Sequence, residues 1–192
     1  MDLTKKADVA ILIDNCIRGD RKSQQTLYKE FYGKMLVVCM RYASDKNEAK
    51  DILHDGFIKV FNKLKSFKNE GSLEGWIRRI MVNNSIDHVR RKREILFAEG
   101  DDFTIEKAIK ESETDDSELF LKEKAEIILS LIQKLSPAYR TVFNMYVIEN
   151  YKHKEIAEHL NINIGTSKSN YAKAKMKLRL FYNEYIEKHD QQ

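Results

Sequence analysis

The chain has very little proline and glycine. Its 192 residues include one proline and seven glycines, and folds built on many tight turns need more of both. With 42% hydrophobic and 33% charged residues, the chain has enough apolar side chains for one or two modest cores. This composition favours an all-α fold made of small helical domains.

Cysteine and long apolar segments are also scarce. Only Cys16 and Cys39 are present, without CxxC spacing, so we predict two buried thiols and neither a disulfide framework nor a cysteine zinc site. The longest apolar run, residues 35–40, is far shorter than the roughly 20 residues needed to cross a bilayer. The N-terminus also lacks the apolar segment and cleavage site of a signal peptide, so a cytoplasmic protein is expected.

Charge is unevenly distributed along the chain. Residues 1–93 have a net charge of +8, residues 94–121 of −8 and residues 122–192 of +4. Two basic blocks on either side of an acidic connector suggest two separate contacts with nucleic acid. The pattern alone fits an ordinary helical protein equally well, because many helical domains are mildly basic.

Apolar residues recur at helical spacing in the first basic block. Steps of three and four residues predict a helix over 48–64, which would bury Ala49, Ile52, Leu53, Phe57, Val60, Phe61 and Leu64. Its other face would show Asp51, His54 and Asp55 to solvent. Further helices are expected around 9–17, over 23–43 and over 72–93, the last with a basic end. The loop at 67–76 could receive unstacked bases or simply connect two helices.

The second basic block begins with another amphipathic pattern. Its apolar stripe is formed by Ile128, Leu131, Ile132 and Leu135. Ser136 and Pro137 then favour a helix start, because serine can cap free amides and proline fits the first turn.

The strongest local signal is KEIAEHLNINIGTSKSNYAKAKMKLR, residues 154–179. A short helix would end near Leu160, and Asn161 suits a sharp turn because asparagine tolerates the left-handed conformation. Asn163 would cap a second helix that starts at about Ile164 and presents polar residues outward. This pattern predicts a helix-turn-helix whose second helix can enter a DNA major groove. The alternative is a plain helical hairpin with a solvated lysine face.

Three segments in this order resemble one family. DILHDGFIKVF, GSLEGWIRRIMVNNSIDHVRR and LSPAYRTVFNMYVIENYKHKEIAEHLNINIGTSKS are similar to the core-binding, promoter-opening and upstream-element segments of extracytoplasmic-function (ECF) sigma factors of bacterial RNA polymerase. The resemblance implies a region 2-like domain over 1–93, a flexible acidic linker over 94–118 and a region 4-like helix-turn-helix domain over 119–192. It also implies a transcription initiation factor that binds core RNA polymerase, helps melt the minus-ten element and is held by an anti-sigma factor.

The resemblance also implies residue roles in the first domain. Asp51, His54 and Asp55 would contact the clamp helices of the polymerase β′ subunit, although the family usually has glutamine at the position of His54. The minus-ten element would be bound by Lys68, Asn69, Arg79, Asn83, Asp87, Arg90 and Arg91. Among these, Lys68 and Asn69 fall in the loop that captures a flipped base, whose edge a polar pocket can read. The arginines would neutralise phosphates.

In the second domain, the residues that match the minus-thirty-five reading positions are Thr166, Ser167, Lys168, Ser169, Asn170 and Lys173. This domain would also contact the flap of the polymerase β subunit. Lysine stands where the family often has arginine, so guanine discrimination should be weaker, whereas Asn170 suits adenine. Lys152 replaces a usual capping serine and Ser167 a usual valine, which suggests a less rigid reader.

The acidic linker has two interpretations. In the resembled family it threads polymerase channels that otherwise hold nucleic acid, so it could mimic RNA there. The alternative is a soluble, extended tether.

No enzyme motif is present. The chain lacks HExxH, a P-loop and GxSxG, and the dipeptide His54-Asp55 lacks the upstream histidine of metal phosphohydrolases. We therefore predict no catalytic residue, metal or cofactor. The main alternative function is a stand-alone helix-turn-helix regulator that binds duplex DNA as a dimer, and a helical adaptor that binds only proteins is disfavoured by the basic second helix.

Overall fold

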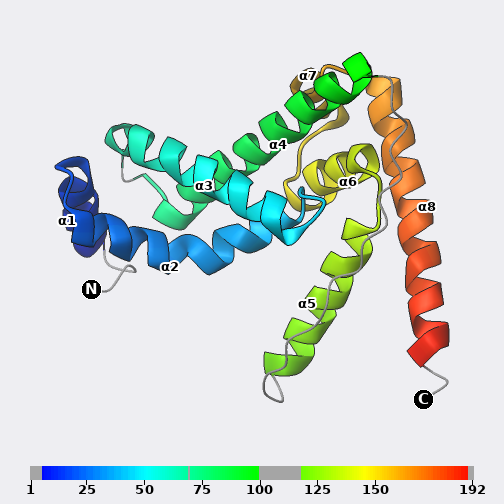
Figure 1. Cartoon of the computed structure of the whole chain (residues 1–192), viewed down its shortest axis with the longest axis horizontal. Helices are drawn as coiled ribbons and strands as arrows, with labels where there is room; N and C mark the ends of the chain where they lie inside the picture. The colour runs from blue at the N-terminus through cyan, green and yellow to red at the C-terminus, as the bar shows by residue number, and fades with distance from the viewer. Residues whose placement is uncertain (1–5, 69, 100–117, 190–192) are drawn as a thin grey trace. The chain divides into compact units, whose positions relative to one another are not determined.

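The computed structural model describes residues 6–68, 70–99 and 118–189, and every element in these ranges is a helix (Figure 1). The chain divides into two compact units, one from the N-terminus to Cys39 with Lys46–His88, the other Met40–Asp45 with the chain from Val89 on. The predicted all-α class with two helical parts is confirmed. Within the described ranges, no helix has the length and apolar content that a bilayer crossing requires.

The first unit contains α1 (Lys6–Ile17), α2 (Arg21–Met40), α3 (Lys46–Lys63), η1 (Leu64–Ser66) and most of α4 (Leu73–Glu99). On α3 the predicted inward residues are buried except Phe61, which is partly exposed. The predicted helix around 9–17 is α1, and it buries Val9, Leu12, Ile13 and Cys16. A stripe at this spacing is the core-facing side of an amphipathic helix.

Both cysteines are free and buried, as predicted. Burial, and then the negative charge of Asp20, raises the pKa of Cys16 to about 11. Since the thiolate is the reactive form, the raised pKa lowers the reactivity of this thiol at neutral pH.

α4 is longer than the sequence predicts. It continues to Glu99, six residues past the predicted boundary at residue 93. The added residues, EILFAE, contain good helix formers and no glycine or proline, so the helix has no reason to stop before Gly100. The rest of the predicted acidic linker, residues 100–117, lies outside the described residues, and both interpretations of it stay predictions.

A glycine allows α3 and α4 to pack closely. A Cβ atom added at Gly56 would overlap the sulfur of Met81, whose side chain is fully buried on α4. Beside this contact, the buried Asn84 donates a hydrogen bond from Nδ2 to the Ile52 carbonyl oxygen on α3, at 2.7 Å. The two helices are therefore joined by a close apolar contact and a polar one.

The second unit contains α5 (Glu118–Gln133), α6 (Pro137–Phe143), the π-helix η2 (Asn144–Ile148), α7 (His153–Leu160) and α8 (Ile164–His189). α8 packs on α6 and α7 and continues beyond them as a long straight helix, drawn in orange to red in Figure 1. The predicted stripe on α5 is buried at Leu131 and Ile132 and at Leu135 just after the helix. Ile128, which belongs to the same stripe, is 56% exposed.

The start of α6 agrees with one of two predictions. Pro137 occupies its first turn, but the Ser136 side chain makes no capping hydrogen bond. The main polar link here is Arg140, which is 4% exposed and donates from Nη2 to the carbonyls of Gln133 and Leu135, both at 2.8 Å. These carbonyls lie at the end of α5 and just beyond it, where the helix has no further amides to donate hydrogen bonds to them.

The contact at Gly56 predicts that two glycine-to-alanine substitutions change the free energy of unfolding in opposite directions. Gly33→Ala, in α2 with no atom within 4 Å of the added Cβ, should stabilise the protein by about 0.5–1 kcal/mol through helix propensity. Gly56→Ala has the same gain but overpacks the core at a cost of about 1–3 kcal/mol. Denaturant unfolding should therefore rank Gly56→Ala below the native protein and Gly33→Ala above it.

The double-mutant cycle with Met81→Ala provides the control. In the Met81→Ala background the space beside Gly56 is open, so Gly56→Ala should become stabilising. If Gly56→Ala raises stability with Met81 in place, the proposed overlap does not constrain the packing.

Candidate nucleic-acid and protein-binding surfaces

The predicted helix-turn-helix is present, and its turn has the predicted chemistry. Asn161 follows α7 in the left-handed conformation, with φ 51° and ψ 51°. The amide of Ile162 donates to the carbonyl of Ala157 at 3.0 Å, which closes the end of α7. α8 then begins at Ile164, and Oδ1 of Asn163 accepts a hydrogen bond from the Thr166 amide at 2.7 Å. Asn163 is the predicted N-cap.

The N-terminus of α7 is capped in one direction only. The side chain of Lys152 has no acceptor with which to cap the helix amides. Glu155, three residues on, accepts a hydrogen bond from the Lys152 amide at 2.6 Å. This is the reciprocal half of a capping box, so part of the capping that the sequence seemed to lack is retained.

The predicted minus-thirty-five residues separate into two groups on α8. Lys168, Ser169 and Lys173 are exposed, and Thr166 and Asn170 are partly exposed. Ser167 is fully buried, on the same inward side as Ala174 seven residues later. Its hydroxyl lies 2.9 Å from Nδ1 of His153, the first residue of α7. The Ser167 side chain therefore faces the core of the unit and not the solvent.

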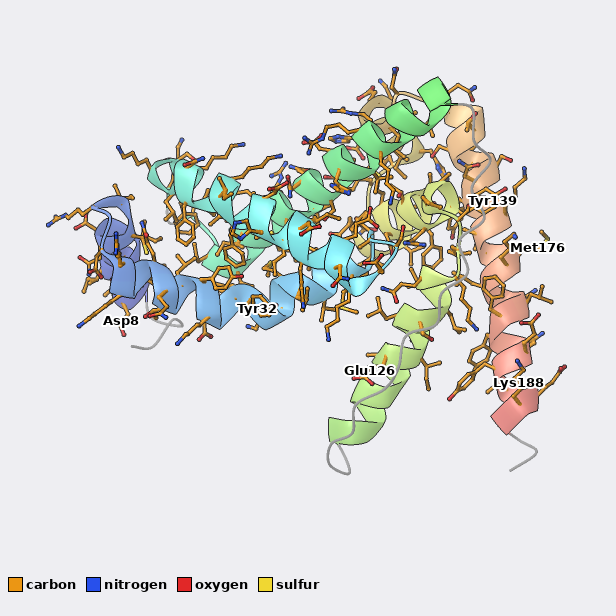
Figure 2. The ribbon with its side chains drawn as sticks, in the orientation of Figure 1. Asp8, Tyr32, Glu126, Tyr139, Met176 and Lys188 are labelled. Carbon is orange, nitrogen blue, oxygen red and sulfur yellow. The ribbon has the colours of Figure 1, made fainter. Side chains whose placement is uncertain are left out.

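The exposed side of α8 also has features that the turn motif did not predict. Lys175, Lys177 and Arg179 extend the basic surface beyond Lys173. Met176 projects from the outer side of the helix and is 66% exposed (Figure 2). The sequence alone shows that the three added basic residues are cations. It does not show that Met176 is exposed, because that depends on which face of α8 is covered.

On α4, the predicted minus-ten residues Arg79, Asn83 and Asp87 follow one another at four-residue steps, so they share a face. Arg79 and Asn83 are exposed. Asp87 is half-buried, and its carboxylate lies 3.6 Å from the ammonium group of Lys59 on α3. The sequence did not predict Lys59 as part of this surface, because the pair joins two helices.

The remaining predicted minus-ten residues come before and after Arg79, Asn83 and Asp87 in the chain. Lys68 is exposed in the loop before α4, near the paired rings of Phe67 and Trp76, whose centroids are 5.4 Å apart. Asn69 lies outside the described residues. Arg90 is partly exposed and Arg91 exposed on the later turns of α4.

The predicted polymerase-binding residues Asp51, His54 and Asp55 are all exposed, at steps of three and four along α3. Ile58, one turn further, is 49% exposed. The outer face of α3 therefore combines two carboxylates, an imidazole and an apolar side chain, a composition that suits a protein partner.

Two family models match the chain in order. Residues 27–95 match Sigma-70 region 2 and residues 125–178 match Sigma-70, region 4, so together they cover more than half of the chain. The first region includes α3 and nearly all of α4. The second includes the whole helix-turn-helix.

Curated relatives and a solved structure agree with this match. The chain is 23% identical over 170 residues to the ECF RNA polymerase sigma-E factor of Haemophilus influenzae, with 85% of this chain and 89% of that protein covered. It is 26% identical over 168 residues to the ECF RNA polymerase sigma factor SigW of Bacillus subtilis, with coverage of 84% and 90%.

The fold is similar to that of the sigma factor RpoE in complex with the anti-sigma factor NepR from Bartonella quintana. The TM-score is 0.51 at 19% identity, over 83% of this chain and 96% of that chain. The matched regions, their order and these relatives agree, and the chain belongs to the extracytoplasmic-function class of bacterial RNA polymerase sigma factors.

Proposed function

We propose that three helix faces of this sigma factor divide the work of initiation. As a member of its family, the protein is a transcription initiation factor that binds core RNA polymerase and directs it to promoters. We assign core binding to the outer face of α3, minus-ten recognition to the face of α4 and minus-thirty-five recognition to the exposed face of α8. The functional domains are residues 1–93 and 119–192, with 94–118 between them.

The observation that supports this assignment best is the helix-turn-helix. Its turn and cap fix where α8 begins, and its solvent face presents Lys168, Ser169 and Lys173 with Thr166 and Asn170 beside them. Lysines can contact phosphates, and hydroxyl or amide groups can read base edges. Ser167 is not in this contact set, because its side chain is buried.

The α4 face suits a single strand better than a duplex. Arg79 supplies positive charge, and Asn83 and Asp87 can bond to the edge of an unstacked base. The ion pair of Asp87 with Lys59 does not prevent this. At about 40% exposure for both side chains, such a pair is worth less than about 1 kcal/mol, so a base can compete for the carboxylate.

For core binding, we propose that Asp51, His54 and Asp55 contact the clamp helices of the β′ subunit, with Ile58 as an apolar neighbour. We further propose that the second domain contacts the β flap. An anti-sigma factor as a further partner is supported by the similar fold of a sigma factor solved with one. We expect the protein to act in the cytoplasm, where these partners are found.

A stand-alone regulator that binds duplex DNA as a dimer is not favoured. It would leave the matched region 2, with its exposed α3 and α4 faces, without a role.

Run-off transcription with core polymerase and fragmented genomic DNA tests the function. Discrete transcripts should appear only when core and this protein are both present, and their start sites identify the promoters. Binding to duplex DNA without core, together with no new transcripts, would support the stand-alone regulator instead.

The same assay tests the α3 face. Asp51→Lys with Asp55→Lys should reduce the transcripts at limiting protein, because the reversed charges oppose the partner surface, and excess protein should partly restore them. Glu30→Lys, a single exposed charge reversal on α2, is the control for added positive charge elsewhere and should leave the transcripts unchanged. If both variants lose transcripts equally, the assignment of core binding to the outer face of α3 is wrong.

The composition of α8 predicts an upstream element that contains adenine. Asn170 can bond to adenine through both its donor and its acceptor, and replacing that base pair should cost about 1–3 kcal/mol of discrimination. DNase protection and base substitution across the element measure this. Asn170→Ala should reduce the preference for adenine at one base pair of the element. Lys175→Ala should instead weaken DNA binding by a similar amount for all sequences. A requirement for guanine alone would contradict the prediction.

A further inference from the structure

The first turns of the recognition helix contain a polar contact made by a buried side chain. Ser167, in the first turns of α8, is 0% exposed and is the only polar residue of that helix among the fully buried side chains. Its Oγ lies 2.9 Å from His153 Nδ1. The two neighbours of Ser167, Thr166 and Lys168, belong to the proposed DNA-reading face.

Aromatic rings hold the His153 imidazole in place. The Tyr146 ring, from η2, stacks on it with a centroid distance of 4.4 Å and an interplanar angle of 15°. The Tyr171 ring, from α8, lies 5.8 Å from the imidazole and 4.5 Å from the Tyr146 ring. The imidazole is thus in contact with aromatic rings from both η2 and α8.

The helix-turn-helix turn does not by itself determine the rotation of α8 about its own axis. Asn161 and Asn163 set where the helix starts, and the hydrophobic effect that drives apolar packing is not directional. A hydrogen bond is directional and weakens steeply when misaligned. One residue of rotation, about 100°, would take Ser167 away from His153 and turn Lys168 away from its present direction.

We propose that the hydrogen bond between His153 and Ser167 sets the rotation of the recognition helix, so that both act as positioning residues for reading the minus-thirty-five element. The inference rests on the proposed function of α8. It gives Ser167 an indirect role in place of the direct DNA contact that its sequence position suggested, and it gives a role to His153, which no motif had singled out.

The environment of the imidazole favours its neutral form. Burial, and then the positive charge of Lys168, lowers the pKa of His153 below its usual value. The titratable groups that face the ring are Tyr146 from η2 and Tyr171 and Lys168 from α8. A depressed histidine pKa means that the unfolded chain binds the proton more tightly. The folded state therefore loses stability as the pH falls below about 6.5.

The test uses the full-length protein with core polymerase. For each variant, transcripts are compared between a promoter found in the run-off assay and the same promoter with its upstream element scrambled. Protein is kept at concentrations and temperatures at which circular dichroism shows each variant folded. The variants are His153→Phe, Ser167→Ala, the double variant and Ser167→Thr.

The ratio of the two transcripts should fall about five- to tenfold in His153→Phe and in Ser167→Ala, as expected for the loss of one hydrogen bond. Ser167→Thr keeps the hydroxyl and should retain more of the ratio than Ser167→Ala. The double variant removes both polar partners, so it should regain stability relative to the single variants. Its ratio should stay low, because the directional contact is still absent.

His159→Phe is the matched control, since it makes the same substitution at an exposed position of the same helix. It should keep the native ratio. A double variant with the native ratio would show that the pair matters only for stability, and single variants with the native ratio would overturn the inference directly. If the native protein directs no transcription from any promoter, the proposed function itself fails.

A pH series gives a second readout. The stability difference between the native protein and His153→Phe should become smaller as the pH falls below about 6.5, because only the native protein then loses stability through this ring. A difference that does not change with pH would contradict the lowered pKa of His153 that its contacts in the folded protein imply.

Discussion

Every helix leaves its first amides and last carbonyls without partners inside the helix. This chain has few of the glycines and prolines that form tight turns, so turns alone do not satisfy these groups. Side chains do so instead. Asp20 accepts from the Ser23 amide at 2.8 Å before α2, and Ser72 accepts from the Gly75 amide at 3.0 Å before α4. Asn163 caps α8, and the buried Arg140 binds carbonyls at the end of α5. These contacts help to determine where α2, α4 and α8 start and where α5 stops, and therefore which of their residues reach the surface.

Because the fold is a set of amphipathic helices, each binding surface is the exposed side of a helix whose other side is in the core. Recognition then depends on the axial rotation of the helix as much as on its residues. On α8 a single step separates buried Ser167 from exposed Lys168. On α4 the buried Asn84 adjoins the exposed Asn83. Polar contacts from two buried side chains, Asn84 to α3 and Ser167 to α7, restrict this rotation more than apolar packing can, since hydrogen bonds depend on angle.

The helix-turn-helix also shows how departures from a family pattern can be compensated locally. Lysine at position 152 cannot cap α7, yet Glu155 binds the amide from the other direction. Serine at position 167 would leave a buried hydroxyl unsatisfied, at a cost of about 1–3 kcal/mol, and His153 removes that cost. A helix-turn-helix with these two residues need not be less rigid. Glu155 lies three residues from Lys152, and His153 lies fourteen residues from Ser167.

The sequence by itself determined the helical class, the order of the two regions, the turn at Asn161 and the face of α3 that contains Asp51, His54 and Asp55. The order of the two regions follows from the resemblance to the family. The other features follow from local rules, because periodicity, capping and left-handed turns depend on residues a few positions apart. The sequence did not determine that Ile128 is exposed, that Ser167 is buried against His153, or that Asp87 pairs with Lys59. Whether a side chain on a predicted helix meets solvent or another helix depends on what packs against it. Only the tertiary structure decides that, because packing joins residues that are distant along the chain.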